Sequence, residues 1–297
     1  MKIIVLGKKG LLSSRLIDFF SANANVDLKT ISLRNSNLLK HFLKGDFQDI
    51  FLNQDCIINA IGPNNIQCAM DNQIAQTFYI DLPIQLIKYA NENKIKYIQF
   101  SSVHSVNYHL SDKKIVLPKD IKPNNAYSKY HNLLEKNFLS EINFNKYATV
   151  IRLCNSIGPP LTKNYYESHW LSICNKFAYQ LLVGEKIILK DPNIYKSFLP
   201  ISSILKNLNI QIRTKERRSI KQFLSNYQIK LKDLADFMAM FINKGRKITK
   251  KENLNYFKKI VFKDNSYSDI VKNNVDEYYD EFVFEIEKTF QILKNFS

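Results

Sequence analysis

Glycine and proline are scarce in this chain of 297 residues, which contains 7 glycines and 8 prolines. No stretch rich in Gly, Pro or Ser divides the chain, which argues against a second domain appended on a linker. Cysteine is scarce too: the 4 cysteines form no C-x-x-C pair, and the 5 histidines are scattered. We therefore expect no metal site and no disulfide, but buried thiols in a reducing cytoplasm.

Long apolar runs are also missing. None reaches the ~18 residues that a transmembrane helix needs. The apolar run at the start is broken by Gly7-Lys8-Lys9-Gly10, too early for a signal peptide. We therefore expect a cytoplasmic protein with no membrane insertion.

Acidic residues are outnumbered, 27 against 43 Lys and Arg, which gives a net charge of +16. Such a charge can serve binding to nucleic acid or to an anionic surface. Here the lysines are spread along the whole chain, and only Arg213–Lys221 forms a local basic run. We expect no nucleic-acid partner, although a nucleic-acid binder remains an alternative that rests on charge alone.

The first twenty residues have a distinct layout. Lys2–Leu6 is a short β-branched run that predicts a strand, and it stops at Gly7. Gly10 and Ser13 follow at three-residue spacing, and apolar residues then recur at the spacing of a helix. A strand, a glycine turn and a helix place backbone N–H groups against a pyrophosphate. Ser13 stands where a third glycine is usual.

Strands and helices alternate over the first half of the chain. Apolar runs predict strands at 26–33, 55–60 and 97–100, and the spacing predicts a helix over 73–93. We therefore expect an α/β fold: a Rossmann-type, doubly wound parallel sheet. Ligands bind such sheets at the carboxyl ends of strands. Those ends are Gly7–Ser13, Arg34, Asn59–Gly62 and Ser101–Ser102.

The residue after the second strand indicates which dinucleotide binds. An acidic residue there contacts the adenosine ribose of NAD, whereas an arginine accommodates the extra phosphate of NADP. This chain has Arg34 there, and no Asp or Glu lies between Arg34 and Asp46. We expect NADP or NAD, with NADP favoured.

Six motifs together carry a family resemblance: GKKGLLS, GDFQD, DCIINAIG, QFSS, a tyrosine in front of a helix, and RLCNSIGPP. In this order the set resembles the extended short-chain dehydrogenase/reductase family, over residues 1–160. Many members are nucleotide-sugar epimerases, dehydratases and reductases, and dimers are common. The resemblance implies a dinucleotide-binding domain over 1–155. A smaller substrate-binding part over 156–297 would be interwoven with it, with some segments returning to the sheet.

The resemblance also implies site residues. The pyrophosphate would be held by Gly7, Gly10, Leu11 and Leu12. The adenine would be contacted by Asp46 and Phe47. The cofactor below the nicotinamide ribose would be lined by Asn59, Ala60, Ile61 and Gly62. Ser102 would hydrogen-bond the reacting oxygen of a nucleotide-sugar substrate, and Asn155 would contact the same substrate. Ser101-Ser102 could equally cap the segment that follows.

The family's catalytic pair is Tyr-x-x-x-Lys at the start of a helix, where both side chains share one face. The lysine lowers the pKa of the tyrosine and binds the nicotinamide ribose. In one register of this chain, Tyr127 is that tyrosine, His131 replaces the lysine and Glu135 matches a common family acid. In the other, Lys129 is the lysine and Asn125 replaces the tyrosine. We favour the first register, because two of its residues fit.

Either register leaves the pair incomplete. His131 is shorter than lysine and is mostly neutral at pH 7, so it would supply less of the charge that activates Tyr127. Two functions therefore stay open. One is an NAD(P)-dependent enzyme acting on a nucleotide sugar, in surface-polysaccharide biosynthesis. The other is a catalytically weak or inactive NAD(P)-binding sensor or partner protein.

The second half shows fewer motifs. Periodicity predicts helices over 165–182, 229–242 and 282–296, with a strand near 197–201.

Overall fold

The structure is a computed structural model that describes residues 1–34, 36–47, 50–106, 123–140, 147–163, 171–214, 219–242, 250–259 and 274–296. These residues form two compact units. The first unit holds the described residues before 154, together with 208–214 and 219–222. The second holds the other described residues.

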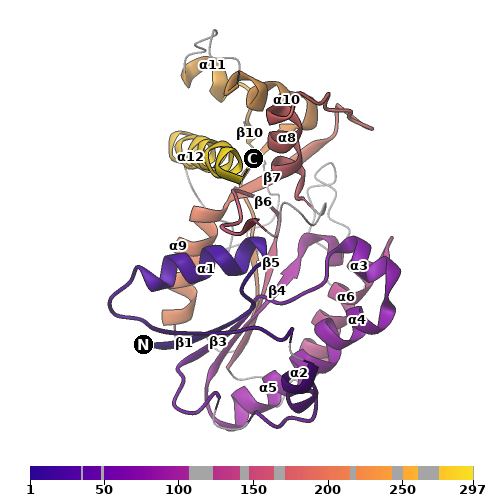
Figure 1. The fold of residues 1–297 in the computed structure, drawn as a ribbon, viewed down its shortest axis with the longest axis vertical. Helices are drawn as coiled ribbons and strands as arrows, with labels where there is room; N and C mark the ends of the chain where they lie inside the picture. Colours follow the sequence, from indigo (N-terminus) through magenta and orange to yellow (C-terminus); the bar gives the residue numbers. More distant parts are fainter. Residues whose placement is uncertain are drawn as a thin grey trace. The chain divides into compact units, whose positions relative to one another are not determined.

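The first unit is built on a six-stranded sheet with the order β2-β1-β3-β4-β5-β8 (Figure 1). Neighbouring strands from β2 to β5 pair in parallel. The strands are β1 (Lys2–Leu6), β2 (Asp27–Ile31), β3 (Cys56–Asn59), β4 (Lys96–Ser102), β5 (Ala148–Leu153) and β8 (Ser219–Phe223). The Rossmann-type parallel sheet predicted from the sequence is confirmed.

The strand order reverses between β1 and β3. The chain runs from β1 outward to β2 and then returns to place β3 on the other side of β1. In open parallel sheets this switch point opens a crevice for ligands outside the carboxyl ends of the strands. Gly7 and Ala60, the residues after β1 and β3, therefore flank the expected binding position.

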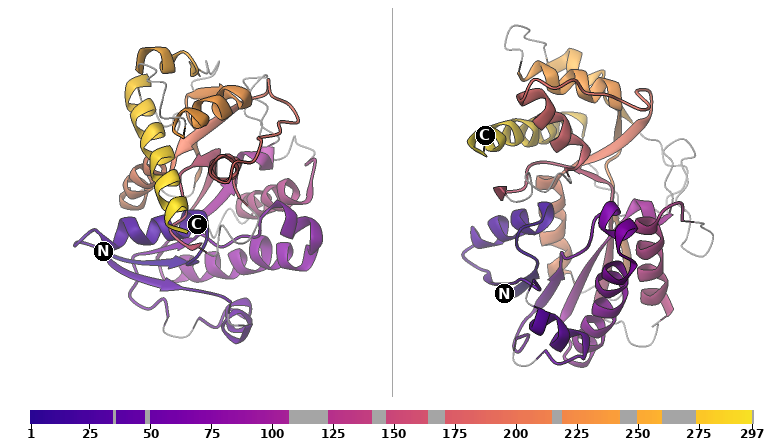
Figure 2. Two further views of the ribbon diagram at one scale, coloured as in Figure 1. Left: turned by 45° about the horizontal axis from the view of Figure 1, so that its top comes forward. Right: turned by 45° about the vertical axis from the view of Figure 1, so that its right-hand side comes forward.

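Alternate residues of the strands pack on opposite faces of the sheet. Ile4 and Leu6 belong to a core shared with α2 (Ser36–Leu43), α5 (Leu82–Glu92) and α6 (Ala126–Ser140). Helix α1 (Leu11–Ser21) lies on the other face (Figures 1 and 2). Both faces are covered, which is why the strands read as continuous apolar runs.

The helix predicted over 73–93 is observed with an irregular centre. After α3 (Asn65–Met70), α4 (Asn72–Gln76) leads into a π-helical turn, η1 (Thr77–Asp81), and then into α5. Pro83 lies at the start of α5. A proline lacks an amide and crowds the carbonyl four residues earlier, and a wider turn relieves that conflict. As a result, Tyr79 projects from the π turn as a buried side chain.

The second unit contains a four-stranded sheet with the order β10-β9-β7-β6. Its core joins residues of these strands to residues of the helices. The elements are β6 (Asn155–Ile157), α8 (Ile173–Leu182), β7 (Tyr195–Pro200), β9 (Tyr227–Lys230), α10 (Leu231–Met240), α11 (Lys250–Leu254), β10 (Lys258–Lys259) and α12 (Val275–Phe296). Helix α9 (Ile201–Arg213) begins in this unit and ends in the first.

Several predicted boundaries in this half need correction. The helix predicted from 165 begins at Ile173, because Ser172 has extended backbone geometry as its N-cap; residues 165–170 lie outside the described residues. The helix predicted from 229 begins at Leu231, because Ile229 pairs with Lys196 in the sheet. The last helix starts seven residues earlier than predicted, at Val275.

Within the described residues, no helix is long and apolar enough to cross a membrane. The same residues hold no group of three or more His, Cys, Asp or Glu placed to bind a metal ion. All four cysteines are free and buried.

Candidate functional site

The turn after β1 requires glycine at position 7. Gly7 has φ +109°, which side-chain-bearing residues rarely adopt, and its amide donates to Ile31 O at 2.8 Å. A Cβ on Gly7 would lie 3.2 Å from Ser13 Cβ and 3.3 Å from Ala60 O. The loops after β1 and β3 are therefore packed backbone to backbone, with no room for a side chain between them.

Ser13 fills the place of a third glycine without widening the turn. It is buried, and its Oγ accepts from Gly10 N at 3.0 Å and donates to Gly10 O at 3.3 Å. Gly10 is the N-cap of α1 and has no side chain to cap the first amides of the helix, those of Leu11 and Leu12. These amides and the helix dipole form the kind of cradle that binds a pyrophosphate.

The residues expected at the adenosine differ in exposure. Arg34 is exposed, three residues beyond β2. The carboxylate of Asp46 is half-exposed and lies 2.6 Å from His41 Nδ1. Phe47, however, is buried in an aromatic cluster with Phe42, Phe51 and Tyr89. The Phe47 side chain is therefore a core residue and is not available to an adenine. The last two residues of GDFQD lie outside the described residues.

Asn59 at the end of β3 is fully buried. Its Nδ2 donates to Gln99 Oε1 at 2.8 Å, and its Oδ1 accepts from Ile61 N at 3.2 Å. The Asn59 side chain thus holds the following loop rather than facing a ligand. Ala60 and Ile61 are half-buried and Gly62 is exposed, so these three can line a ligand.

The start of α6 distinguishes the two registers. Asn125 Oδ1 accepts from Ser128 N at 2.8 Å, and Ser128 Oγ accepts from Asn125 N at 3.2 Å. Asn125 therefore caps the helix. Lys129 is exposed, whereas His131 is buried. The geometry agrees with the register that pairs Tyr127 with His131.

Tyr127 lies in an aromatic cluster at the end of β4. Its ring centroid is 4.4 Å from that of His131, 6.2 Å from that of Tyr79 and 6.1 Å from that of His104. Burial raises the pKa of Tyr127 to about 12, although hydrogen bonds with Ser102 and Tyr79 lower it in part. The phenol therefore keeps its proton at neutral pH.

His131 is neutral in this environment. Its ring lies between those of Tyr79 and Tyr127, each 4.4 Å away between centroids. Burial, and to a lesser degree the nearby His104, lowers the pKa of His131 to about 3. The expectation that residue 131 supplies little positive charge to Tyr127 is therefore supported by its surroundings.

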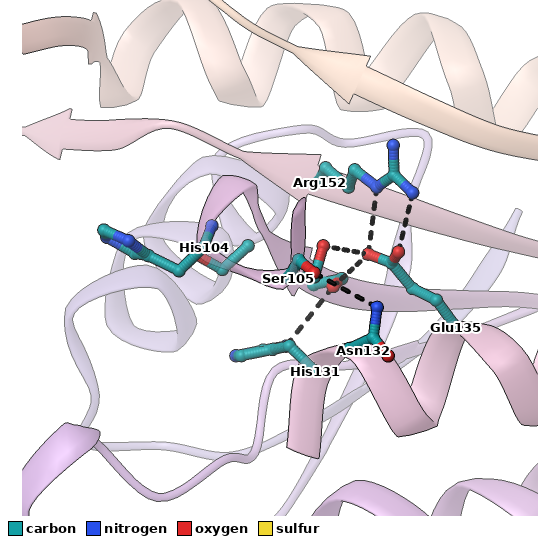
Figure 3. A network of polar contacts seen from close by, with 8 residues as sticks. His104, Ser105, His131, Asn132, Glu135 and Arg152 are labelled. Carbon is teal, nitrogen blue, oxygen red and sulfur yellow. Dashed lines mark hydrogen bonds and ion pairs between the residues drawn. The ribbon is translucent and has the colours of Figure 1, made fainter. Parts of the chain in front are cut away.

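A buried ion pair lies behind His131. Arg152 Nη2 is 2.7 Å from Glu135 Oε2, and Arg152 Nε donates to Glu135 Oε1 at 3.0 Å. Ser101 Oγ and Ser105 Oγ donate to the same Oε1 at 2.6 Å and 2.8 Å. Figure 3 shows the carboxylate facing the guanidinium, with the His131 ring pointing away from it. The network joins α6 to the ends of β4 and β5.

The two residues expected at the substrate lie in different units. Ser102 is buried, hydrogen-bonds with Tyr127 and accepts from His104 N at 3.2 Å. Its Oγ therefore has both the predicted neighbour and a local capping contact. Asn155 opens the second unit, where its Nδ2 donates to Ser197 O at 3.0 Å. That bond joins β6 to β7.

Sequence reasoning missed Tyr79 and His104. Tyr79 lies 48 positions before Tyr127, and its hydroxyl donates to Pro63 O at 2.6 Å. The only signal for it was Pro83, which predicts a local irregularity in the helix but not which side chain it turns inward. His104 lies two residues after Ser102, in a short 3₁₀ turn over Val103–Val106, so its proximity could have been inferred.

No model of a protein family matches the chain, and no curated protein matches it. Solved structures do match in fold. The UDP-N-acetylglucosamine 4-epimerase from Methanobrevibacter ruminantium, in complex with UDP-N-acetylmuramic acid, is 15% identical with a TM-score of 0.77, over 99% of this chain and 98% of that one.

Two further structures match over similar lengths. The dTDP-glucose 4,6-dehydratase from Bacillus anthracis, in complex with NAD, is 13% identical with a TM-score of 0.69, over 99% of this chain and 97% of that one. RMD from Pseudomonas aeruginosa, complexed with NADPH, is 15% identical with a TM-score of 0.67, over 99% and 98%. The fold expected from the resemblance is confirmed along nearly the whole chain.

Proposed function

We propose that this chain is an NAD(P)-dependent enzyme that acts on a nucleotide sugar, as an epimerase, dehydratase or reductase. The observation that carries the proposal is the meeting of Tyr127 and Ser102 at the end of β4. They lie in the same unit as the glycine turn after β1. Neighbours in fold include an epimerase complexed with a nucleotide sugar and a dehydratase complexed with NAD.

The residues present fit a dinucleotide. A Cβ on Gly7 would fill the space between the turn and Ala60, and the helix behind Gly10 begins without a side-chain cap. His131 Nε2 is buried and has no hydrogen-bond partner among the described residues, as expected of a group that meets a ligand. Arg34 favours NADP, and neighbours complexed with NAD and with NADPH keep both open.

A bound nicotinamide dinucleotide would supply hydride transfer. The chain's own part would be to hold and move a proton. Tyr127 carries its proton at neutral pH, so it would donate to a sugar oxygen more readily than it would accept. Ser102 would orient that oxygen. Proton abstraction by Tyr127 would be slow, because no cation among the described residues stabilises the phenolate.

The products would serve surface-polysaccharide biosynthesis, with the protein in the cytoplasm and as a homodimer. The role and the homodimer rest on the resemblance alone, and the cytoplasm rests on the unpaired cysteines and the missing long apolar runs of the sequence.

Replacement of Tyr127 tests the proposal. Turnover of a panel of UDP- and dTDP-sugars with NAD or NADP is followed by nicotinamide absorbance. Tyr127→Phe should lower kcat by about 10²- to 10⁴-fold and leave dinucleotide affinity unchanged. Tyr130→Phe is the matched control: this tyrosine of the same helix packs in the same apolar core as Tyr79, but its hydroxyl donates to Asn72 O. Full activity of Tyr127→Phe would overturn the proposed role.

A second function is favoured by the state of His131. A neutral, buried imidazole in place of a cation suits a dinucleotide-binding sensor or partner protein with little turnover. Calorimetry that shows dinucleotide binding, together with no turnover of any sugar nucleotide and none in His131→Lys, would favour this function over the enzyme.

A further inference from the structure

The proton on His131 can be located by counting donors in the buried network. Glu135 accepts four hydrogen bonds, two from Arg152 and one each from Ser101 and Ser105. The bidentate pair with the guanidinium keeps Glu135 as a carboxylate, which has no proton to give. Every contact of Glu135 in this network therefore uses a proton from its partner.

Because Ser101 must donate its proton to Glu135, it also determines which nitrogen of His131 carries a proton. Its hydroxyl has one proton, and that proton is donated to Glu135 Oε1 at 2.6 Å. The other contact of Ser101 Oγ, to His131 Nδ1 at 3.3 Å, then requires the imidazole to be the donor. The neutral ring thus carries its proton on Nδ1, and Nε2 holds a bare lone pair.

That lone pair lies in a buried position. The His131 side chain is only 4% exposed, and Nε2 has no hydrogen-bond partner within the described part of the chain. The rings of Tyr79 and Tyr127 enclose the imidazole. Buried acceptors without a donor are rare in proteins, because such a group loses its bond to water and gains nothing.

We propose that His131 Nε2 accepts a hydrogen bond from a hydroxyl group of the bound ligand. Glu135, acting through Ser101, is the positioning residue that keeps this nitrogen unprotonated. The proposal rests on the proposed function, in which the cofactor and the substrate both carry sugar hydroxyls. It reverses the polarity of the site: a lysine at 131 would donate, whereas His131 accepts.

The reversed polarity selects the ligand group. A hydroxyl can donate to Nε2, whereas a phosphate or carboxylate oxygen offers only lone pairs and would meet the bare nitrogen unfavourably. The proposed group is therefore a sugar hydroxyl, either of the dinucleotide cofactor or of the nucleotide-sugar substrate.

Nitrogen NMR of the full chain with ¹⁵N-labelled histidine tests the tautomer at neutral pH. We expect the His131 signals to show a protonated Nδ1 and an unprotonated Nε2. They are identified among the five histidines by their loss in His131→Gln, or by backbone-linked assignment if that variant does not fold. A protonated Nε2 would overturn the proposal.

Two serines provide a matched pair of variants. Ser101→Ala removes the acceptor of the Nδ1 proton and should move the tautomer toward protonated Nε2. Ser105→Ala removes an equal hydrogen bond to Glu135 Oε1 without touching His131, and should leave the tautomer unchanged. A purely structural role would give both variants the same spectrum, which would contradict the positioning role of Ser101.

Titration with NADP, NAD and a UDP-sugar, each alone, identifies the hydroxyl. A change in the Nε2 signal with a dinucleotide assigns a cofactor ribose, and a change only with the UDP-sugar assigns the substrate. If calorimetry shows binding but Nε2 does not respond, the inference fails while the proposed function stands. If none of the three ligands binds, the proposed function fails, and so does the proposed hydrogen bond from a ligand hydroxyl to His131.

Affinity gives a second readout. His131→Phe keeps an aromatic ring and removes the acceptor. It should weaken the ligand that moves Nε2 by about 2- to 12-fold, the range for one neutral hydrogen bond. An unchanged affinity for that ligand would contradict the proposal.

Discussion

The candidate site has one part at the carboxyl end of β1 and another at the carboxyl end of β4, and the two parts use different kinds of chemical group. After β1, Gly7 and Gly10 matter because they lack side chains, and the groups proposed to face a ligand are backbone amides. After β4, Tyr127, His131 and Ser102 act through side chains whose charge and proton positions depend on burial.

This difference between the two strand ends explains how such a fold can keep the glycine turn after its first strand while the proton-transfer chemistry at another strand end changes. A backbone cradle is preserved wherever the strand, turn and helix are preserved. A tyrosine that must lose a proton depends on a nearby cation, and the side chain beside Tyr127 at position 131 is a buried, neutral imidazole. Similarity of fold does not by itself give a function, so dinucleotide binding and turnover by this chain need separate tests.

The largest expected effect lies behind the end of β4. Glu135→Leu would leave the Arg152 guanidinium buried without its partner and should lower the free energy of unfolding by about 3–5 kcal/mol. Chemical denaturation measures this loss. The double variant Glu135→Leu/Arg152→Met should recover much of it, because a buried apolar pair can replace a buried ion pair.

If Glu135→Leu were as stable as the original chain, the side-chain network at the end of β4 would not depend on its buried ion pair. Lys206→Ala is the control, because it removes an ion pair with Glu281 in which the lysine side chain is 61% exposed. Its cost should stay below about 1 kcal/mol.

The next effect is a loss of stability in acid. The pKa of His131 is about 3 in the folded chain and about 6.5 in the unfolded chain. Between these values the unfolded state binds more protons, so stability falls as the pH drops below 6.5. At pH 4.5 the loss is about 2–3 kcal/mol, since one pKa unit corresponds to 1.36 kcal/mol.

Denaturation of the original chain and of His131→Gln from pH 7 to pH 4.5 measures this contribution. The variant should lose less stability over that range. Identical slopes in the two proteins would mean that His131 is not held neutral.

The glycine turn offers the converse test. Gly7→Ala puts a Cβ against Ser13 and Ala60 at φ +109°, and should cost about 1–3 kcal/mol while abolishing dinucleotide binding. Gly184→Ala is the matched control: φ is +75° there, but the added Cβ meets nothing within 4 Å. It should cost about 1 kcal/mol and leave binding unchanged. Equal loss of dinucleotide binding in both variants would mean that the turn at Gly7 does not contact the dinucleotide.

Much of the fold could be predicted from local sequence. A β-branched run that ends at a glycine predicts β1 and its turn, because backbone conformation is decided within a few residues. The helix predicted over 73–93 was right in extent but not in its π turn, since the effect of Pro83 depends on how the surrounding chain packs.

The candidate site could be predicted only where its chemistry is local. Tyr127 and His131 are four residues apart on one helix, so their shared face follows from spacing. The neutrality of His131 depends on its burial against Tyr79, which the sequence does not predict. The hydrogen bond from Ser101 to Glu135 joins residues that are 34 positions apart. Such contacts arise from tertiary packing and leave no periodic signal in the sequence.

The smallest expected effect concerns the choice of dinucleotide. Arg34 is exposed beyond the end of β2, so a charge-assisted hydrogen bond to the extra phosphate of NADP would lie at the low end of its range, near 1.5 kcal/mol or about tenfold in affinity. Arg34→Ala should reduce the affinity for NADP by about this factor and leave that for NAD unchanged. Parallel titrations at two salt concentrations measure it, because screening should shrink the NADP preference of the original chain but not the ratio in Arg34→Ala. A ratio that Arg34→Ala does not alter would remove this arginine from the binding site. The proposed backbone cradle at Gly7 and Gly10 would be unaffected, since the pyrophosphate that it would bind is common to both dinucleotides.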